Sequence, residues 1–579
     1  MGAFFLVKHN SQIDSEHAIS KLKAQFTQQG FSSPQVVSTT EYDLYVYSKI
    51  VTQNKNIVHL EDNDYCASTG TLIYKSQIGI PALTDCHKNH APGDIAPADF
   101  YGAFCLITSK QGKTHLQIDP LGIYKVYKDS TDTIWSSSFL GVASALSSNI
   151  INTQSVYEYV FQGATYGDET LFEAISLLEA NKTYEIGQTV SITNRNIEIG
   201  SSFVNDSLSD HLENNSSNLY DYYSAIKNCF GDNVDTALSG GFDSRLTLSL
   251  LHQQDITPKV HVYGKPNDDD VLVASNIDKF ESLDLKHIDK SNFPEIGLNE
   301  FPDLIAKNFV DFDAYPCDGI FDNGQDIKSR TSRCANDELM LNGGGGEIFR
   351  NFFYLWDKTF SLKGFLWSFY SRFDPKACSN KFNEATYYFN LGAKIKKTLK
   401  TDKNKLSRAE IELVYPLFRC RYWMGKNNSI NNKLGYALTP FIDYNIVFDA
   451  MKIPLKYKNY GNFEGKLINL ISPRLAKYPS AYGYSFNNDA PLKNRLKELA
   501  TYIRPSYLRK YSYRIQTRQK KLDLPYYLTA PYRKAIQIDE FEYMNNYFDL
   551  NTVRDTEQYR RICTLEYLFN QLDPTISKA

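Results

Sequence analysis

The sequence predicts a chain of two regions: an antiparallel, sandwich-like half followed by an α/β half with a parallel sheet. Residues 1 to about 200 carry short runs of strand-forming side chains separated by turns, which is typical of antiparallel sheets. From about residue 218, strands alternate with helices, the pattern of βαβ units and hence of a parallel sheet covered by helices. At 579 residues the chain is too long for one core, so two or more domains are expected.

Short strand patterns fill the first region, interrupted by one or two helices, including one expected at residues 13–30. The predicted strands are AFFLV (3–7), TLIYK (71–75), AFCLITS (103–109), HLQID (115–119), TIWSSS (133–138), KTYEI (182–186) and VSITN (190–194). A polar segment rich in Ser, Asn and Asp follows at residues 201–217 and is interpreted as a linker.

The second region begins with alternating helices and strands. We expect helices at 220–230, 245–254 and 270–280, and strands at 234–238 and 259–264. Beyond residue 350 the chain is mainly helical and aromatic. The predicted domains are therefore residues 1–200 and 218–579, joined by the linker.

Composition excludes several classes of protein. The chain is 42% hydrophobic and 22% charged, with a net charge of −3, so no overall charge favours nucleic acid or a membrane surface. Its nine cysteines are scattered without a CxxC pair or zinc-ligand spacing, which fits a reduced cytoplasm. No apolar run approaches the length of a membrane span. The segment 504–521 is locally basic; we favour a solvated helix face, with an anionic partner as the alternative.

The most informative segment is a glycine turn between a predicted strand and a predicted helix. Its candidate nucleotide-binding residues are Leu238, Ser239, Gly240, Gly241, Asp243 and Ser244. Glycines allow the backbone to curl around an oxyanion, and the helix N-terminus offers unpaired N–H groups and a positive dipole end. The two serines add hydroxyl donors, and Asp243 supplies a hard oxygen for Mg²⁺. The turn therefore predicts a phosphate site, with a helix N-cap as the alternative role of Asp243.

This turn resembles the pyrophosphate loop of the ATP-pyrophosphatases, and its flanks resemble the asparagine synthetase family. Residues 341–349 (LNGGGGEIF) are similar to the family's second glycine motif, typically SGEGSDE followed by Ile/Leu-Phe, and residues 440–443 (PFID) to its PFLD segment. The resemblance implies that Asn342, Gly343 and Tyr263 contact the nucleotide. It also implies that Glu347 binds magnesium with Asp243, and that Lys477 is the catalytic lysine that holds pyrophosphate. The alternatives are a helix cap for Glu347, a surface lysine for Lys477 and a structural turn at Tyr263.

The first region resembles the glutaminase domain of the same family. Residues 101–104 (YGAF), 119–122 (DPLG) with Tyr127, and 170–172 (TLF) are similar to its pattern. The resemblance implies an N-terminal αββα sandwich of the N-terminal-nucleophile (Ntn) type. It also implies a C-terminal pyrophosphate-loop domain, adenine nucleotide α-hydrolase-like, with a helical C-terminal part. The portion beyond about residue 490 has no counterpart.

Three positions depart from the family pattern. Position 2 is Gly where family glutaminases carry their nucleophilic cysteine, so glutamine hydrolysis is not expected. The family's β-lactam synthetases and lasso-peptide cyclases also lack this cysteine and use an amine from the substrate. Gly344 replaces an acidic or tyrosine residue between the glycines, and Glu347 stands for an Asp.

The resemblance implies an ATP-dependent ligase that adenylates a carboxylate, releases pyrophosphate and lets an amine attack, without glutamine hydrolysis. The expected cofactors are ATP and Mg²⁺, and the expected partners are small-molecule or peptide carboxylate and amine substrates. We expect no nucleic acid or membrane partner and leave a homodimer open. An ammonia-dependent asparagine synthetase and a nucleotide-binding pseudoenzyme are the alternatives.

Overall fold

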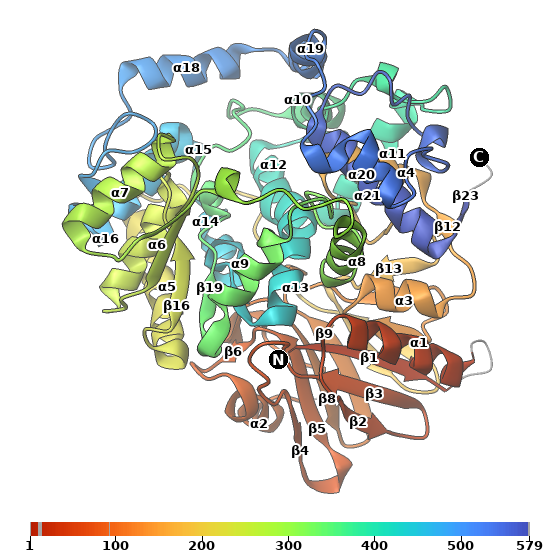
Figure 1. Ribbon diagram of the computed structural model, residues 1–579. Helices are drawn as coiled ribbons and strands as arrows, with labels where there is room; N and C mark the ends of the chain where they lie inside the picture. The colour runs from red at the N-terminus through yellow and green to blue at the C-terminus, as the bar shows by residue number, and fades with distance from the viewer. Residues whose placement is uncertain (1, 10–13, 92, 577–579) are drawn as a thin grey trace.

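The N-terminal region is built from two six-stranded antiparallel sheets that share one core, seen in the lower part of Figure 1. The computed structural model describes residues 2–9, 14–91 and 93–576. The first sheet has the order β13 (Ile175–Leu177), β10 (Tyr127–Asp129), β11 (Ile134–Ser136), β1 (Ala3–Lys8), β3 (Tyr42–Tyr47) and β2 (Gln35–Ser38). The second has the order β15 (Val190–Asn194), β14 (Lys182–Ile186), β9 (Lys113–Ile118), β8 (Phe104–Lys110), β5 (Tyr65–Gly70) and β4 (Ile57–His59).

Helices cover the outer faces of these sheets. Helices α1 (Ser15–Gln28) and α3 (Phe139–Ala145) pack on the first sheet, and α2 (Gly79–Asn89) packs on the second. All six residues of β1 are buried, because the second sheet covers one of its faces and the helices cover the other. The predicted αββα layering of this region is confirmed. Each predicted strand contains a strand, although 71–75 contributes only β6 (Ile73–Tyr74), paired with β7 (Phe100–Tyr101). The first residue of the predicted helix, position 13, lies outside the described residues.

The C-terminal region contains a five-stranded parallel sheet. Its order is β18 (Lys286–Ile288), β17 (Lys259–Tyr263), β16 (Val234–Ala237), β19 (Leu339–Leu341) and β22 (Tyr436–Leu438). After β16 the chain adds β17 and β18 on one side of it, and then adds β19 and β22 on the other side. Such a reversal opens a crevice at the carboxyl ends of the central strands, where α/β proteins bind ligands. The predicted α/β pattern with a parallel sheet is confirmed.

The expected linker is partly helical. Helix α5 (Leu208–Phe230) starts ten residues earlier than the domain boundary at 218 suggests. A capping box starts it: the Ser207 side chain accepts from the Asp210 N–H, and the Asp210 side chain accepts from the Ser207 N–H. The polar composition of 208–217 therefore comes largely from an exposed helix face, and this part of the expected linker is helical.

Helices dominate the rest of the chain. They are α4 (Thr153–Gln162), α6 (Phe242–Gln253), α7 (Asp269–Glu281), α8 (Phe301–Asp311), α9 (Gln325–Arg333), α10 (Leu362–Phe369), α11 (Glu384–Leu399), α12 (Arg408–Val414), α13 (Gly425–Leu434), α14 (Tyr444–Ala450), α15 (Leu455–Lys458), α16 (Asn462–Ile471), α17 (Pro473–Ala476), α18 (Leu492–Ile503), α19 (Ser506–Thr517), α20 (Ala530–Ala535) and α21 (Thr556–Leu572). Within residues 2–9, 14–91 and 93–576, no helix combines the length and the apolar character needed to cross a bilayer.

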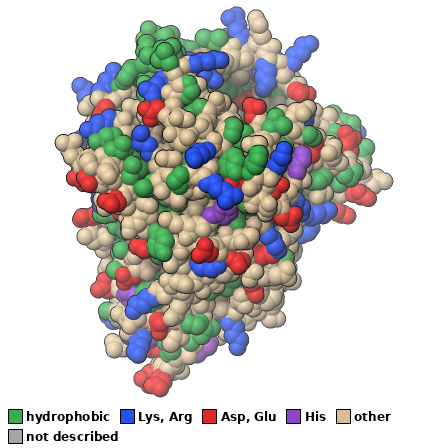
Figure 2. Space-filling view, turned by 90° about the vertical axis from the view of Figure 1, so that its left-hand side faces the viewer, with side chains coloured by type: hydrophobic (Ala, Val, Ile, Leu, Met, Phe, Trp, Pro, Cys, Tyr) green, Lys and Arg blue, Asp and Glu red, His purple; other side chains and the backbone are tan. Residues whose placement is uncertain are grey.

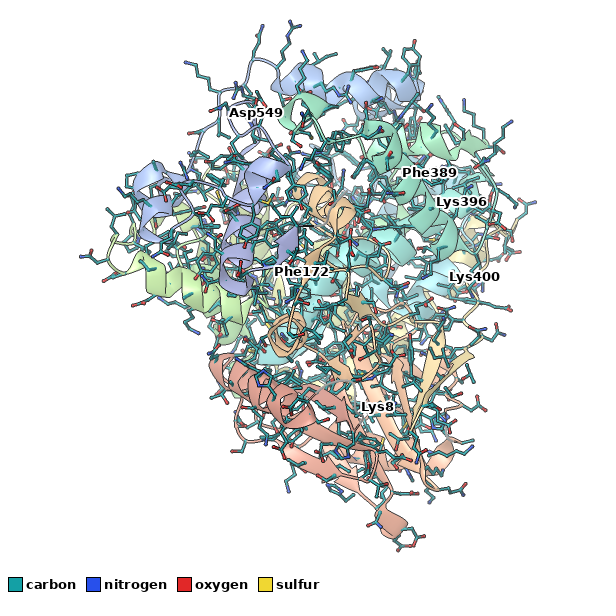
Figure 3. The ribbon with its side chains drawn as sticks, turned by 90° about the vertical axis from the view of Figure 1, so that its right-hand side faces the viewer. Lys8, Phe172, Phe389, Lys396, Lys400 and Asp549 are labelled. Atoms are coloured by element: carbon teal, nitrogen blue, oxygen red, sulfur yellow. The ribbon has the colours of Figure 1, made fainter. Side chains whose placement is uncertain are left out.

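The two regions share an extensive buried junction. The last helix, α21, packs on α4, and the short strand β23 (Thr575–Ile576) pairs with β12 (Ile150–Ile151). Phe172 marks this junction in Figure 3: its ring stacks on that of Phe139, at 5.5 Å between centroids, and lies 6.2 Å from that of Phe569. The end of the chain is thus part of the core that holds the N-terminal region in place.

A buried aspartate provides the strongest polar link across the junction. Asp313 accepts hydrogen bonds from the Ser138 hydroxyl (2.5 Å) and from the N–H of Phe139 (2.8 Å), the first residue of α3. The ammonium groups of Lys433 and Lys426 lie 3.4 and 3.7 Å from its carboxylate. Burial alone would raise the pKa of Asp313, but these lysines and hydrogen bonds hold it at about 2. The carboxylate is therefore ionised and paired at physiological pH.

Two of the motif segments also meet at the junction. The Asp443 carboxylate, in the 440–443 segment, accepts the Gly102 N–H at 2.8 Å. Asp119 accepts the N–H groups of Ile123 (2.9 Å) and Tyr124 (2.8 Å) and so closes the turn of its own segment. The described contacts of these two aspartates are structural, because both carboxylates accept hydrogen bonds from backbone N–H groups.

Replacing Asp313 by Asn should lower the free energy of unfolding by about 3–5 kcal/mol, because two buried lysines lose their counter-charge. The folded pKa of about 2 lies below the ordinary 3.8, so this stabilisation is present above pH 4 and is lost as the pH falls through about 2. Thermal midpoints measured against pH test this. Asp232→Asn, which removes an exposed pair with Lys227, is the control and should change the midpoint little. A wild-type-like midpoint for Asp313→Asn at neutral pH would contradict the account.

Candidate functional site

The glycine turn joins β16 to α6 at the centre of the parallel sheet, as the sequence predicts. Leu238 is buried, and Gly241 is the N-cap of α6. The Ser244 hydroxyl accepts the Ser239 N–H at 3.0 Å, and the two serine hydroxyls lie 3.0 Å apart. The serine hydroxyls thus brace the turn and hold its backbone in a curled form.

An acidic side chain and a neighbouring loop cover this turn. The Gly240 N–H donates to the Asp270 carboxylate at 2.8 Å, and the Gly240 carbonyl accepts the Ala481 N–H at 3.0 Å. A Cβ added at Gly240 would lie 2.6 Å from that of Ala481, so only glycine permits this approach. The Tyr482 ring lies 5.1 Å from that of Phe242, the first residue of α6. An anion at the Gly240 N–H must therefore displace Asp270.

Three carboxylates surround the guanidinium of Arg350 beside the turn. Arg350 Nη2 lies 2.5 Å from Asp243 and 3.6 Å from Glu347, and its Nε lies 2.9 Å from Glu464. These side chains come from the start of α6, the four-glycine segment and α16, and Glu464 is fully buried. Tyr415 donates its hydroxyl to Glu347 at 2.6 Å. We call Asp243, Glu347, Glu464 and Arg350 the Arg350 cluster.

Burial and the shared guanidinium set the pKa values in the Arg350 cluster. Burial raises the pKa of Asp243 to about 6, against the opposing effect of Arg350. Burial likewise raises the pKa of Glu464 well above its usual value, with the neighbouring carboxylates adding to the effect. For Glu347, burial is outweighed by Arg350 and by the Tyr415 hydrogen bond, so its pKa is lowered. Even with Glu464 protonated, the cluster carries more negative than positive charge above pH 6.

This arrangement does not fit a magnesium ion held by Asp243 and Glu347. Both predicted ligands face the Arg350 guanidinium, and Asp243 also accepts the Gly346 N–H at 3.2 Å. Among residues 2–9, 14–91 and 93–576, no three His, Cys, Asp or Glu side chains are grouped to hold a metal ion. The excess negative charge nevertheless favours a further cation if Arg350 moves away. Magnesium binding here stays a prediction.

A pocket of about 380 Å³ lies at the carboxyl ends of β16, β17, β19 and β22. Its lining includes two of the predicted nucleotide contacts, Tyr263 and Asn342. The Tyr263 hydroxyl lies 2.6 Å from that of Ser329, which holds the ring at the pocket wall. Gly343 sits against α6, where an added Cβ would lie 2.7 Å from the Thr247 hydroxyl. We call this space the sheet-end pocket.

Cationic side chains line the sheet-end pocket, and none of them was predicted as a site residue from the sequence. They are Lys290, Arg330 and Arg333. Arg333 pairs with Asp235 at 2.5 Å, and Arg330 pairs with Asp326 at 3.0 Å. Lys290 Nζ lies 4.6 Å from the centre of the Tyr263 ring. The sequence of α9 is rich in cations and could have indicated Arg330 and Arg333. Their position at the end of the sheet depends on the tertiary fold.

A second cavity of about 520 Å³ adjoins the sheet-end pocket. The two share Lys290, Asp326, Arg330 and Asn427 in their walls. The far end of the second cavity is lined by Tyr526, Tyr527 and Arg560, from the last part of the chain. Side chains of both charges line the two cavities, and the four shared residues place the cavities next to each other.

Lys477 is not brought into contact with the glycine turn. It follows α17 and is exposed, and no hydrogen bond or ion pair joins its ammonium group to a described residue. The next two residues, Tyr478 and Pro479, accept hydrogen bonds from the Arg245 guanidinium at 2.7 and 2.8 Å through their carbonyls. This segment is therefore anchored to α6, while the catalytic role of Lys477 stays a prediction.

Position 2 lies buried at the edge of β1 with no room for a side chain. A Cβ added at Gly2 would lie 2.3 Å from the Ser48 carbonyl oxygen and 2.6 Å from the Lys49 nitrogen. The Gly2 carbonyl accepts the Tyr124 hydroxyl at 3.2 Å. The backbone of 48–49 thus occupies the volume that a nucleophilic side chain would need.

Comparisons with known proteins add little to this geometry. No protein-family model matches the chain, and no curated protein gives a significant match. Among solved structures, glutamine phosphoribosylpyrophosphate amidotransferase from B. subtilis, complexed with ADP and GMP, is similar over 41% of this chain and 60% of that chain, at 10% identity and a TM-score of 0.22. A structure described as the allosteric regulatory enzyme of purine biosynthesis is similar over the same shares, at 9% identity and a TM-score of 0.23. The chain thus covers 60% of these two proteins, and TM-scores this low carry no argument about its function.

Removing the Arg350 charge should tighten divalent-cation binding near Asp243, because the guanidinium competes with any cation for the same carboxylates. For Arg350→Gln we expect roughly tenfold higher Mn²⁺ affinity than for the wild type, measured by electron paramagnetic resonance titration. Arg333→Gln, which breaks the pair with Asp235 under the sheet-end pocket, is the matched control and should leave Mn²⁺ affinity unchanged. Equal affinities for a folded Arg350→Gln and the wild type would contradict this view of the Arg350 cluster.

Proposed function

We propose that this protein is an ATP-dependent ligase of the asparagine synthetase type that works without glutamine hydrolysis. The observation that carries the proposal is the sheet-end pocket, which lies where the strand order of the parallel sheet reverses. Its lining reaches Ala237, the last residue of β16, directly before the glycine turn. Tyr263 offers an aromatic wall for adenine. The turn would supply backbone N–H groups to the phosphates once the Gly240 N–H is released from Asp270. The adjoining cavity offers space for the carboxylate and amine substrates.

In the proposed reaction, a substrate carboxylate oxygen attacks the α-phosphorus of ATP. The new bond gives an acyl-adenylate, and the bond to pyrophosphate breaks. An amine then attacks the acyl carbon, the bond to AMP breaks, and the amine loses a proton. Lys290, at the junction of the two cavities, is positioned to orient an anionic group of the substrate.

Asp270 controls access of phosphate to the turn in this proposal. Its carboxylate accepts the Gly240 N–H, so a nucleotide phosphate would replace the Asp270 carboxylate at this donor. Magnesium, if it joins the nucleotide, would supply positive charge for the phosphates, and Asp243 and Glu347 become available to it only when Arg350 withdraws.

A nucleotide-binding pseudoenzyme is the second candidate. Two contacts favour the pseudoenzyme: the Gly240 N–H is bonded to Asp270, and the Asp243 carboxylate is paired with Arg350. Catalysis would need both the N–H group and the carboxylate to be free. The two candidates differ in turnover: the ligase forms AMP and pyrophosphate, while the pseudoenzyme binds ATP unchanged.

The closed space at Gly2 supports the absence of glutaminase activity in either candidate. Restoring a nucleophile by Gly2→Cys should therefore not create activity, because the new Cβ collides with the Ser48 carbonyl. We expect no release of glutamate from glutamine, and a lower thermal midpoint than the wild type. Gly187→Cys is the control for the midpoint, since its added Cβ meets nothing closer than 3.6 Å. Steady glutamate release by Gly2→Cys would show that the site is open.

Filling the sheet-end pocket should weaken ATP binding. Gly344 lines the pocket, and a Cβ added there points at the flexible Met424 side chain, 3.0 Å away. For Gly344→Trp we expect at least a roughly tenfold loss of ATP affinity in a calorimetric titration, with an unchanged fold. Gly297→Trp, whose added Cβ meets no atom within 4 Å, should bind ATP like the wild type. ATP affinity retained by Gly344→Trp would move the nucleotide out of this pocket.

A further inference from the structure

Helices α18 and α19 expose a row of large apolar side chains at one edge of the molecule. The exposed residues are Leu492 (72%), Leu496 (53%), Ile503 (64%), Tyr507 (56%), Leu508 (47%), Tyr511 (45%) and Ile515 (72%). We call these seven residues the apolar ridge. Figure 1 places both helices at the upper limit of the molecule, and Figure 2 shows hydrophobic and basic side chains together there.

The spacing of the apolar ridge gives each helix one apolar face. In α18 the positions 492, 496 and 503 fall on one side, and in α19 the positions 507, 511 and 515 do the same. A helix of a globular protein normally turns such a face towards the core. Both helices here turn it to solvent, so the face has no partner within the described chain.

The inward side of the pair is firmly anchored. Arg509, which is buried, donates to the backbone carbonyls of Phe353 (3.2 Å) and Tyr354 (2.6 Å). Arg514 pairs with Glu384 of α11 at 2.6 Å, and α19 packs along α10. The outward direction of the apolar ridge is therefore set by specific contacts on its opposite side.

Basic residues surround the apolar ridge. Residues 492–521 contain ten Lys or Arg and one Glu, in a chain with a net charge of −3. Six of these cations are exposed and form no ion pair with a described residue: Lys493, Lys497, Arg504, Arg518, Lys520 and Lys521. The apolar ridge thus lies within a field of uncompensated positive charge.

We propose that α18 and α19 form a docking surface for an anionic membrane, lying in the headgroup layer with the apolar ridge towards the acyl chains. Helices with an apolar face, flanking cations and interfacial tyrosines bind membrane surfaces in this way without spanning them. A second copy of the chain is a poor occupant, because a symmetric contact would place the same positive field against itself. The edge position lets a flat bilayer reach both helices at once.

This proposal departs from the expectation of no membrane partner, which rested on the net charge of the whole chain. It is independent of the proposed ligase chemistry, since none of the seven residues lines the sheet-end pocket or the cavity beside it.

Vesicle flotation with the full chain tests the proposal. Wild-type protein should float with vesicles of phosphatidylcholine and phosphatidylserine, bind them less at high salt, and bind pure phosphatidylcholine vesicles weakly. The double variant Ile503→Ser/Ile515→Ser should lose roughly tenfold of the bound fraction. A second variant, Lys520→Gln/Lys521→Gln, should lose binding only to the anionic vesicles.

The control is Leu272→Ser, which changes a 53% exposed leucine outside the apolar ridge and should float like the wild type. Circular dichroism confirms that each variant is folded. The proposal is overturned if the wild type does not float with anionic vesicles, or if the Ile503/Ile515 variant floats equally well. It is also overturned if the apolar ridge instead drives concentration-dependent self-association that this variant abolishes, or binds an acidic protein and no vesicle.

Discussion

The partly buried charge of Arg350 is the interaction on which the packing around the glycine turn depends. One guanidinium joins three carboxylates from α6, the four-glycine segment and α16, and Glu464 has no access to solvent. Without that cation, an ionised Glu464 would lose its counter-charge in the core at a cost of several kcal/mol, and the partly buried Asp243 and Glu347 would lose theirs at a lower cost. The same cation limits what Asp243 can do, because a carboxylate paired at 2.5 Å is not free for a metal. The Asp243 carboxylate can therefore pair with Arg350 or bind a metal ion, but it cannot do both.

In the N-terminal region, close packing leaves no room for a side chain at position 2. Its two antiparallel sheets form an αββα sandwich with the covering helices, and backbone atoms of 48–49 fill the space beside Gly2. At the junction with the C-terminal region, a cavity lined by Lys125, Tyr127 and Lys426 measures only about 20 Å³, which leaves room for roughly one water. Burial lowers the pKa of Lys426 to about 8. The described contacts of this region are those of a structural support for the C-terminal region.

Much of the architecture was predictable from the sequence because it follows local periodicity. The antiparallel strands, the βαβ units and the strand–turn–helix setting of the glycine turn all rest on short-range patterns. The start of α5 was missed because its polar residues resemble a linker, while a capping box at Ser207 makes them a helix.

The remaining features depend on residues far apart in the chain. Asp270 on the Gly240 N–H and Arg350 among three acids arise from tertiary packing across 30 to more than 100 residues. The basic segment 504–521 was recognised, but the outward direction of its apolar face depends on Arg509 and on its contacts beyond the helix. Composition can identify such a segment, whereas only the fold shows which side of it is left uncovered.

A nucleotide site at the end of the parallel sheet is tested most directly by locating ATP on the protein. A photoactivatable azido-adenine analogue of ATP should label peptides that line the sheet-end pocket, those containing Tyr263 and Asn342, and excess ATP should suppress the labelling. Mass spectrometry of the labelled peptides gives the position. Labelling confined to other parts of the chain, or labelling that ATP does not suppress, would contradict a nucleotide site at the end of the parallel sheet.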